Sequence, residues 1–210
     1  RDQPHRQFPP VAPSPTPATG EEDRELSAES NLPFRPTGQD DLAPPGATAK
    51  LRANLDALDV LRRCRAEARP AEVDEQVVLA RWSGWGSIPQ VFDDADDRFA
   101  GERIEIRRLL GTEEAWSQAR RTTLNAHYTS ASVVAAMWSA VGGLGVDGKV
   151  RVLEPGCGSG NFLGFAPSDA VLTGVELDPI TADIARHLYG TRATIHTGAF
   201  EDLRVEDGAF

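Results

Sequence analysis

The fold is decided by the stretch Val152-Leu-Glu-Pro-Gly156-Cys-Gly-Ser-Gly160-Asn-Phe162. A strand-like run, which begins at Val150, closes with the acidic residue Glu154, and three glycines follow at alternate positions. Glycine permits tight backbone turns and lets a ligand approach the backbone closely. The sequence therefore predicts a strand, a glycine turn and a ligand site directly after the strand.

Two more strand-like runs follow, at residues 170–176 and 193–196, and a helical run at 180–188 separates them. Strands that alternate with helices indicate an α/β fold with a parallel, Rossmann-like sheet. Such sheets bind ligands at the carboxyl ends of their strands. We expect a partial sheet of this kind, preceded by a helical region and a disordered, proline-rich N-terminus.

The glycine spacing distinguishes between two cofactors. A dinucleotide fingerprint, G-x-G-x-x-G, needs its third glycine at position 161, but Asn161 stands there and the glycine comes one residue early. This spacing disfavours NAD and resembles the S-adenosylmethionine site of class I methyltransferases. Glu154 offers a carboxylate where the ammonium of the methionine moiety would lie, and Glu176, at the end of the next strand, can accept both ribose hydroxyls.

Two neighbours of these residues receive structural interpretations. Asp178 precedes Pro179 at the predicted start of a helix, so we interpret it as the helix cap. Cys157 is a small filler rather than a nucleophile, because nothing near it in the sequence would activate a thiolate. Both cysteines, Cys64 and Cys157, are expected to be reduced thiols, and no metal site is expected.

The composition excludes several classes of protein. The net charge is −10, with 22 Lys and Arg against 32 Asp and Glu. This argues against a basic protein that coats nucleic acid. No apolar run approaches the roughly 20 residues that span a bilayer, and the N-terminus does not look like a signal peptide. We expect a cytoplasmic protein without membrane contact.

The chain divides into three predicted parts: a disordered linker at residues 1–48, a helical region at 49–124 and a cofactor-binding domain at 125–210. Ten of the fifteen prolines lie in the first part, which has little apolar material to bury. Leu32–Pro36 is alternatively a docking peptide. Helices are predicted from apolar periodicity near Leu51 to Leu61 and at 73–82, 101–110, 113–124 and 131–141.

Two tryptophans in the helical region, Trp82 and Trp85, admit two interpretations. They pack the helical region onto the following domain, or they stack on nucleic-acid bases. We favour packing.

The chain from roughly Leu79 to Phe210 resembles bacterial and phage-borne N6-adenine DNA methyltransferases that are fused to a superfamily 2 helicase. The matching segments are Leu79–Phe92, Thr123–Ser130, Leu153–Phe162, Gly174–Asp178 and Phe200–Glu201. Asn125–Ser130 looks like the Tyr-Thr-Pro segment of that family, with Ser130 in place of proline. In the family this segment folds over the methionine end of the cofactor. His127, within it, is interpreted as structural.

The resemblance implies a set of cofactor-binding residues for S-adenosylmethionine. They are Tyr128, Thr129, Glu154, Pro155, Gly156, Gly158, Gly160, Asn161, Phe162, Glu176, Leu177, Phe200 and Glu201. Many relatives have Gly-Asp-Phe after the third strand, where the Asp bonds the adenine amino group, but this chain has Ala199. Either Glu201 replaces that contact or the contact is lost.

The family's catalytic motif, Asn/Asp-Pro-Pro-Tyr/Phe, is absent from the 210 residues. We expect it beyond Phe210, in a larger protein of which this chain is a piece, so the chain alone is expected to be inactive. The implied activity is methyl transfer to adenine N6 in DNA, with DNA bound mostly by other segments and a helicase domain in the same protein. The alternatives are an inactive cofactor-binding scaffold or sensor beside a helicase, and a methyltransferase with a non-DNA substrate.

Overall fold

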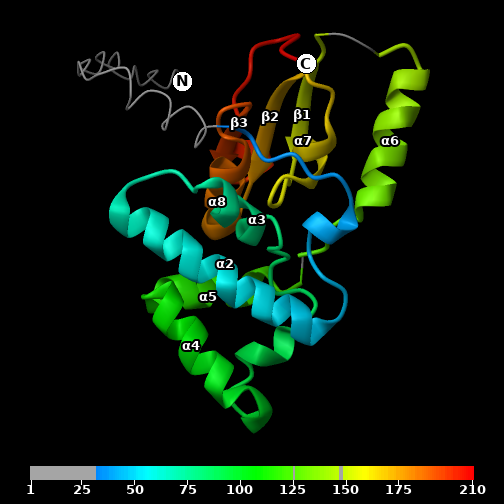
Figure 1. Ribbon diagram of the computed structural model, residues 1–210. Helices are drawn as coiled ribbons and strands as arrows, with labels where there is room; N and C mark the ends of the chain where they lie inside the picture. Colours follow the sequence, from blue (N-terminus) through cyan, green and yellow to red (C-terminus); the bar gives the residue numbers. More distant parts are fainter. Residues whose placement is uncertain (1–31, 125, 147–148) are drawn as a thin grey trace, which may run out of the picture.

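The computed structural model describes residues 32–124, 126–146 and 149–210. A group of helices occupies one end of the molecule and a small sheet the other (Figure 1). The first 31 residues of the predicted linker lie outside the described residues. None of the described helices is long and apolar enough to cross a membrane.

Three parallel strands form the sheet: β1 (Arg151–Pro155), β2 (Val171–Glu176) and β3 (Ala193–Thr197), in the order β1-β2-β3. Glu154 pairs with Gly174, and Glu176 pairs with Thr197. The short helix α7 (Asn161–Phe165) connects β1 to β2, and α8 (Pro179–Tyr189) connects β2 to β3. The predicted α/β arrangement with a parallel sheet is confirmed, and its strand ends meet at one edge.

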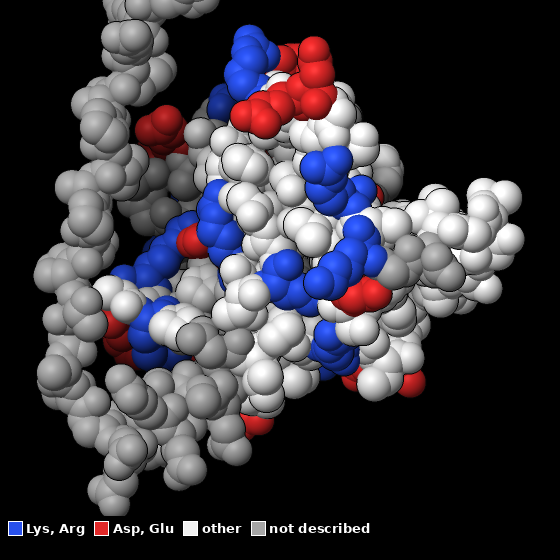
Figure 2. Space-filling view, turned by 90° about the horizontal axis from the view of Figure 1, so that it is seen from above, with Lys and Arg blue, Asp and Glu red and all other residues white. Residues whose placement is uncertain are grey.

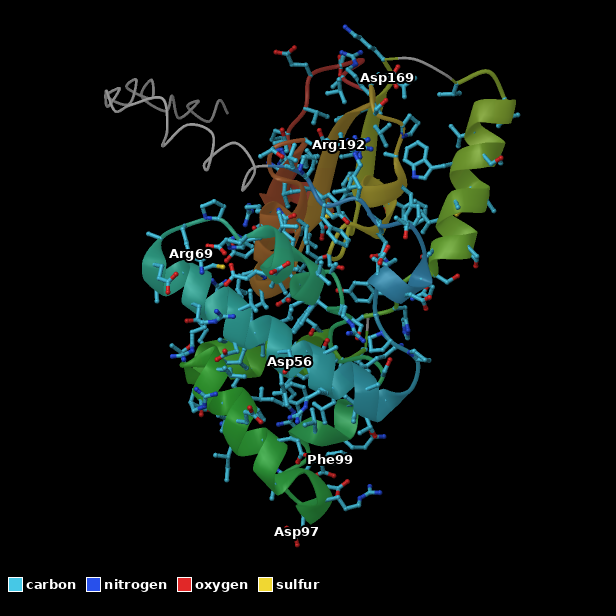
Figure 3. All side chains as sticks on the ribbon, viewed as in Figure 1. Asp56, Arg69, Asp97, Phe99, Asp169 and Arg192 are labelled. Atoms are coloured by element: carbon cyan, nitrogen blue, oxygen red, sulfur yellow. The ribbon has the colours of Figure 1, made fainter. Side chains whose placement is uncertain are left out.

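Arg192 lies at the end of the connection from α8 to β3. Arg192 donates to the carbonyl oxygens of Leu163 (2.9 Å) and Ala166 (2.7 Å) at the end of α7 (Figure 3). These carbonyls lie at the C-terminus of α7, where Leu163 O accepts only a long backbone bond from Ala166 N (3.4 Å) and a helix leaves acceptors unsatisfied. Arg192 therefore ties α7 to the turn before β3.

The helical region contains α2 (Ala47–Glu67), α3 (Val73–Leu79), α4 (Ala100–Leu110) and α5 (Glu113–Thr122). The 3₁₀ turns η2 (Pro89–Phe92) and η3 (Asp97–Phe99) lie between α3 and α4. The predicted helices are confirmed, although α3 and α5 end earlier than the periodicity indicated. Thr112 caps α5 by accepting from Ala115 N, which fixes where that helix begins.

A row of aromatic side chains fills the core of the helical region. Trp82, Trp85, Phe92 and Trp116 contact one another in sequence, with ring centroids 4.7 to 5.5 Å apart. Such edge-on and tilted pairs stabilise by about 0.5–1.5 kcal/mol beyond the area they bury. Trp82 and Trp85 are both 1% exposed, so packing, and not base stacking, is their role.

The helical region and the sheet share one hydrophobic core. Buried side chains of α2, α5, α7, α8 and β3 belong to a single cluster, which includes Leu58, Trp116, Leu163, Ile184 and Ile195. This cluster includes residues of both predicted parts, 49–124 and 125–210. The apolar side chains on the outside of each part pack against the other part and are buried there.

Residues 32–46 are packed against this body, so the prediction of a disordered linker is wrong for them. Phe34 N donates to Leu188 O at the end of α8 (2.8 Å), and Gln76 Nε2 donates to Leu32 O (3.1 Å). Leu42, after the turn η1 (Gln39–Asp41), is 2% exposed. The apolar side chains that lie between the prolines pack against a surface of the folded body, and the composition of the segment alone does not predict this surface.

The helix α6 (Ala131–Gly143) stands at the side of the sheet (Figure 1). Its N-terminal Ala131 N donates to Gln39 Oε1 (3.0 Å), and Trp138 Nε1 donates to Phe162 O (3.0 Å). These contacts place the preceding segment, residues 126–130, beside the glycine turn.

Candidate functional site

A cavity of about 520 Å³ lies between the carboxyl ends of β1 and β2 and the helical region. Its volume lies within the ~300–1,000 Å³ typical of small-molecule sites. Nine of the predicted cofactor-binding residues line it: Tyr128, Thr129, Glu154, Gly156, Gly158, Asn161, Phe162, Glu176 and Leu177. Three segments of the sequence, 128–129, 154–162 and 176–177, thus meet around one space.

The glycine turn forms the floor between the two strands. Gly156 and Gly158 have φ of +77° and +57°, values that a side chain makes costly. The backbone N–H groups of Gly156 and Cys157 both donate to Val175 O (2.8 Å each), which pins the turn to β2. A Cβ added at Gly156 would meet nothing within 4 Å, so the backbone here is open to the cavity.

Glu176 joins the turn to the start of α8. Its Oε2 accepts from Gly158 N (2.9 Å) and its Oε1 accepts from Asp178 N (2.8 Å). Burial raises the pKa of Glu176, and these backbone donors act against that rise. Each carboxylate oxygen has two lone pairs, so each can still accept from a hydroxyl of a bound ligand.

Glu154 is the second carboxylate of the cavity, at the end of β1. The side chain is half-buried and has neither a hydrogen bond nor an ion pair to any described residue. Burial raises the pKa of Glu154. A cationic ligand group would offset this cost, because it would supply the counter-charge that the described protein lacks.

Asp178 caps α8, as predicted, and also lines the cavity. Its Oδ2 accepts from Thr181 N (2.9 Å) and Thr181 Oγ1 (2.6 Å), and Thr181 Oγ1 in turn accepts from Trp82 Nε1 (3.0 Å). The buried Oδ1 of Asp178 has no partner among the described residues. The wall of the cavity therefore carries a third negative charge that the protein satisfies only in part.

Tyr128 fills the space between the helical region and the glycine turn. A Cβ at Gly158 would stand 3.2 Å from the Tyr128 ring, and one at Gly84 would stand 3.6 Å from it. Burial and the charge of Glu176 raise the pKa of Tyr128, so its hydroxyl stays protonated. Asn161 Nδ2 donates to Thr129 O (3.0 Å) and holds the same segment against α7.

Four predicted residues do not line the cavity: Pro155, Gly160, Phe200 and Glu201. Gly160 instead serves packing, because a Cβ there would lie 2.5 Å from the Tyr189 ring. Phe200 and Glu201 belong to the turn η4 (Phe200–Asp202) and are exposed. The hypothesis that Glu201 replaces the acid missing at Ala199 has no support in this geometry.

Two residues with structural interpretations also line the cavity. Cys157 is buried, and its Sγ would stand 2.8 Å from a Cβ added at Gly174, so it fills the space that this glycine leaves. Burial and the charges of Glu176 and Glu154 raise the pKa of Cys157 to about 12. It is therefore a thiol, not a nucleophilic thiolate. His127, which the sequence led us to interpret as structural, is exposed and lines the cavity.

Sequence reasoning missed the wall that the helical region contributes. Gln118, Arg121 and Thr122 of α5 line the cavity together with Gly84 and Thr181. A signal was available, because positions 118, 121 and 122 form one polar helix face opposite the buried Trp116 and Ala119. The described residues contain no group of three or more His, Cys, Asp or Glu that could hold a metal ion.

Neither a known protein-family profile nor a curated protein matches the sequence. Among solved structures, the chain is similar to a protein from Listeria monocytogenes that is described as a class I S-adenosylmethionine-dependent methyltransferase. The identity is 16% and the TM-score 0.30, over 74% of this chain and 56% of that one. The chain thus spans a little over half the length of that structure.

Proposed function

We propose that this chain binds S-adenosylmethionine and belongs to a methyltransferase. The observation that carries the proposal is the shared cavity at the carboxyl ends of β1 and β2, where Glu154, the Gly156–Gly158 turn and Glu176 meet. The residues fit the cofactor: the open backbone at Gly156 allows close approach, and the carboxylates suit a ligand with a cationic end and hydroxyls. The bound cofactor would supply an electrophilic methyl group on a sulfonium.

The roles of the residues follow from their positions. Glu176 would accept hydrogen bonds from the ribose hydroxyls with the lone pairs that its backbone donors leave free. Glu154 would pair with the ammonium of the methionine moiety. Leu177, which is exposed at the cavity edge, would lie against the adenine ring. Tyr128 would shield the cofactor from the helical side.

We further propose that the methyl acceptor is the N6 amino group of adenine in DNA. This rests on the Asn125–Ser130 segment and on the Trp-rich segment Leu79–Phe92, which resemble those of adenine methyltransferases fused to helicases. The amino lone pair is delocalised, so the group must be polarised by an acceptor. The Asn/Asp-Pro-Pro-Tyr/Phe motif, which has that role and stacks on the flipped base, is not among these 210 residues.

DNA would be held mainly by other parts of such a protein. On the face shown in Figure 2, Lys and Arg side chains are interspersed with uncharged and acidic residues. With a net charge of −10, this chain has no surplus of cations for phosphate neutralisation. A helicase domain in the same protein remains part of the proposal, on the basis of the resemblance alone.

Titration calorimetry of the chain with S-adenosylmethionine and with NAD tests the cofactor. We expect preference for S-adenosylmethionine, and a loss of about 1.5–3 kcal/mol of binding free energy in Glu176→Ala, the size of a charge-assisted hydrogen bond. Glu201→Ala is the matched control, because it removes a carboxylate that does not line the cavity. Equal affinity for NAD, or equal affinity of the two variants, would refute the assignment.

The acceptor is tested separately, with labelled cofactor and duplex DNA. The chain alone is expected to transfer no methyl group, and a protein that also contains the motif is expected to label adenine N6. Transfer by these 210 residues alone, or labelling of RNA or protein in place of DNA, would contradict the proposal.

A further inference from the structure

The helix α5 separates the core of the helical region from the cavity. Its apolar face, with Trp116 and Ala119, is buried in the core. Its other face presents Gln118, Arg121 and Thr122 to the cavity, and all three are polar. A wall of hydrogen-bonding groups opposite the glycine turn indicates that a polar part of the ligand lies against α5.

Arg121 is the only Lys or Arg among the described residues that line the cavity. Its Nη1 donates to Ser117 Oγ one turn earlier (3.0 Å), and within the described chain it forms no ion pair. By contrast, Arg107 of the neighbouring α4 pairs with Glu113 and covers the Trp116 ring. The Arg121 guanidinium has five N–H donors, so most of them remain available to a ligand.

The other charged side chains of the cavity are carboxylates: Glu154, Glu176 and Asp178. The ligand that suits such a cavity has cationic groups for the carboxylates and an anionic group for the arginine. The amino-acid end of S-adenosylmethionine has an ammonium and a carboxylate on the same carbon. A guanidinium matches a carboxylate with two parallel hydrogen bonds.

We propose that Arg121 binds the α-carboxylate of the methionine moiety, so that the helical region supplies a specificity-determining residue of the cofactor site. This inference rests on the proposed function. The cavity has the volume of a site for one small molecule, and Arg121 shares it with the cofactor-binding carboxylates, which favours the cofactor over a phosphate of a nucleic acid. A cofactor analogue without the carboxylate would lose this contact and keep all the others.

The test compares three ligands by calorimetry: S-adenosylmethionine, its decarboxylated analogue and 5′-methylthioadenosine, which lacks the whole amino-acid end. The wild-type chain is expected to prefer S-adenosylmethionine to the decarboxylated analogue by about tenfold to a hundredfold, the range for a charge-assisted hydrogen bond. Arg121→Ala should abolish that preference and leave the affinity for 5′-methylthioadenosine unchanged. Arg121→Lys should restore part of it.

Arg120→Ala is the control, because Arg120 is exposed on the same helix but does not line the cavity, and this variant should keep the full preference. A preference that survives in Arg121→Ala would overturn the inference, and so would an equal loss for 5′-methylthioadenosine. Weaker binding of a labelled DNA duplex, with unchanged cofactor affinity, would assign Arg121 to the nucleic acid instead. If the wild-type chain bound no adenosyl ligand, the proposed function would fail first. If Glu176→Ala lost the cofactor while Arg121→Ala kept its preference, only this inference would fail.

Discussion

Alanine substitutions at two glycines of the same turn should rank in one order by their effect on stability and in the reverse order by their effect on binding. Gly156 and Gly160 have φ of +77° and +96°, so each substitution costs about 1–2 kcal/mol of backbone strain. At Gly156 no steric cost is added to this backbone strain, because the new Cβ would meet no atom within 4 Å. At Gly160 the Cβ would lie 2.5 Å from the Tyr189 ring, and such overpacking costs a further ~1–3 kcal/mol.

We therefore expect Gly160→Ala to lose about 2–5 kcal/mol of unfolding free energy, and Gly156→Ala about 1–2 kcal/mol. Urea unfolding, followed by tryptophan fluorescence, measures both, and an unchanged m-value confirms that the two-state comparison is valid. Binding should show the reverse order. Gly156→Ala places a methyl group in the cavity and should lower the affinity for S-adenosylmethionine by about tenfold or more. Folded Gly160→Ala should bind the cofactor with the affinity of the wild type.

A double variant isolates the steric part of the Gly160 effect. Tyr189→Ala removes the ring that the new methyl group would strike, so Gly160→Ala should cost less in that background than in the wild type. Equal destabilisation by the two single glycine variants, or an unchanged cost of Gly160→Ala without the Tyr189 ring, would refute the reasoning from free space.

Three other outcomes are expected. Trp82→Phe keeps an aromatic ring but removes the donor to Thr181 Oγ1, so we expect a loss of about 1 kcal/mol in urea unfolding, against ~3–5 kcal/mol for Trp82→Ala; an unchanged stability of Trp82→Phe would contradict the role of the hydrogen bond. The Arg69 guanidinium holds the pKa of Glu75 at about 2, below its usual 4.5. The stability that this pair contributes should therefore be complete above pH 4.5 and be lost as the pH falls toward 2. Glu75→Gln should flatten this pH dependence of the unfolding free energy, and an acid profile parallel to that of the wild type would disprove the role of the pair. The chain should bind duplex DNA negligibly at physiological salt in a fluorescence anisotropy titration, because of its net charge of −10; tight, salt-sensitive binding would contradict this and indicate a basic patch that faces DNA.

The strand ends and the glycine turn could be predicted because their signals are local. Glycines at alternate positions after Glu154, and an acidic residue at the end of the next strand, place carboxylates and backbone at one edge of any parallel sheet. Asp178 was predicted as a cap for the same reason, since a cap depends only on the few residues that follow it.

The rest depends on contacts between distant segments. Gly160 has the sequence appearance of a ligand-binding glycine, but the Tyr189 ring, which comes from the far end of α8, occupies the space beside it. Residues 32–46 have the composition of a linker, but a surface made by α3 and α8 is available to them. Arg121 looks like an ordinary cation near a helix C-terminus, because nothing local indicates that α5 faces the strand ends.

The hydrogen bond from Trp82 to Thr181 affects how this chain could be recombined with others. The indole ring comes from the segment after α3, and its acceptor lies in the first turn of α8, next to the residue that caps that helix. A chimera that joined residues 126–210 to a different helical partner would leave Thr181 without its donor and an aromatic-shaped gap beside the cavity. The unit that can be exchanged intact therefore runs from residue 32 to β3, because Phe34 and Gln39 also bond to α8 and α6, and a graft that keeps these residues together should preserve the shape of the site.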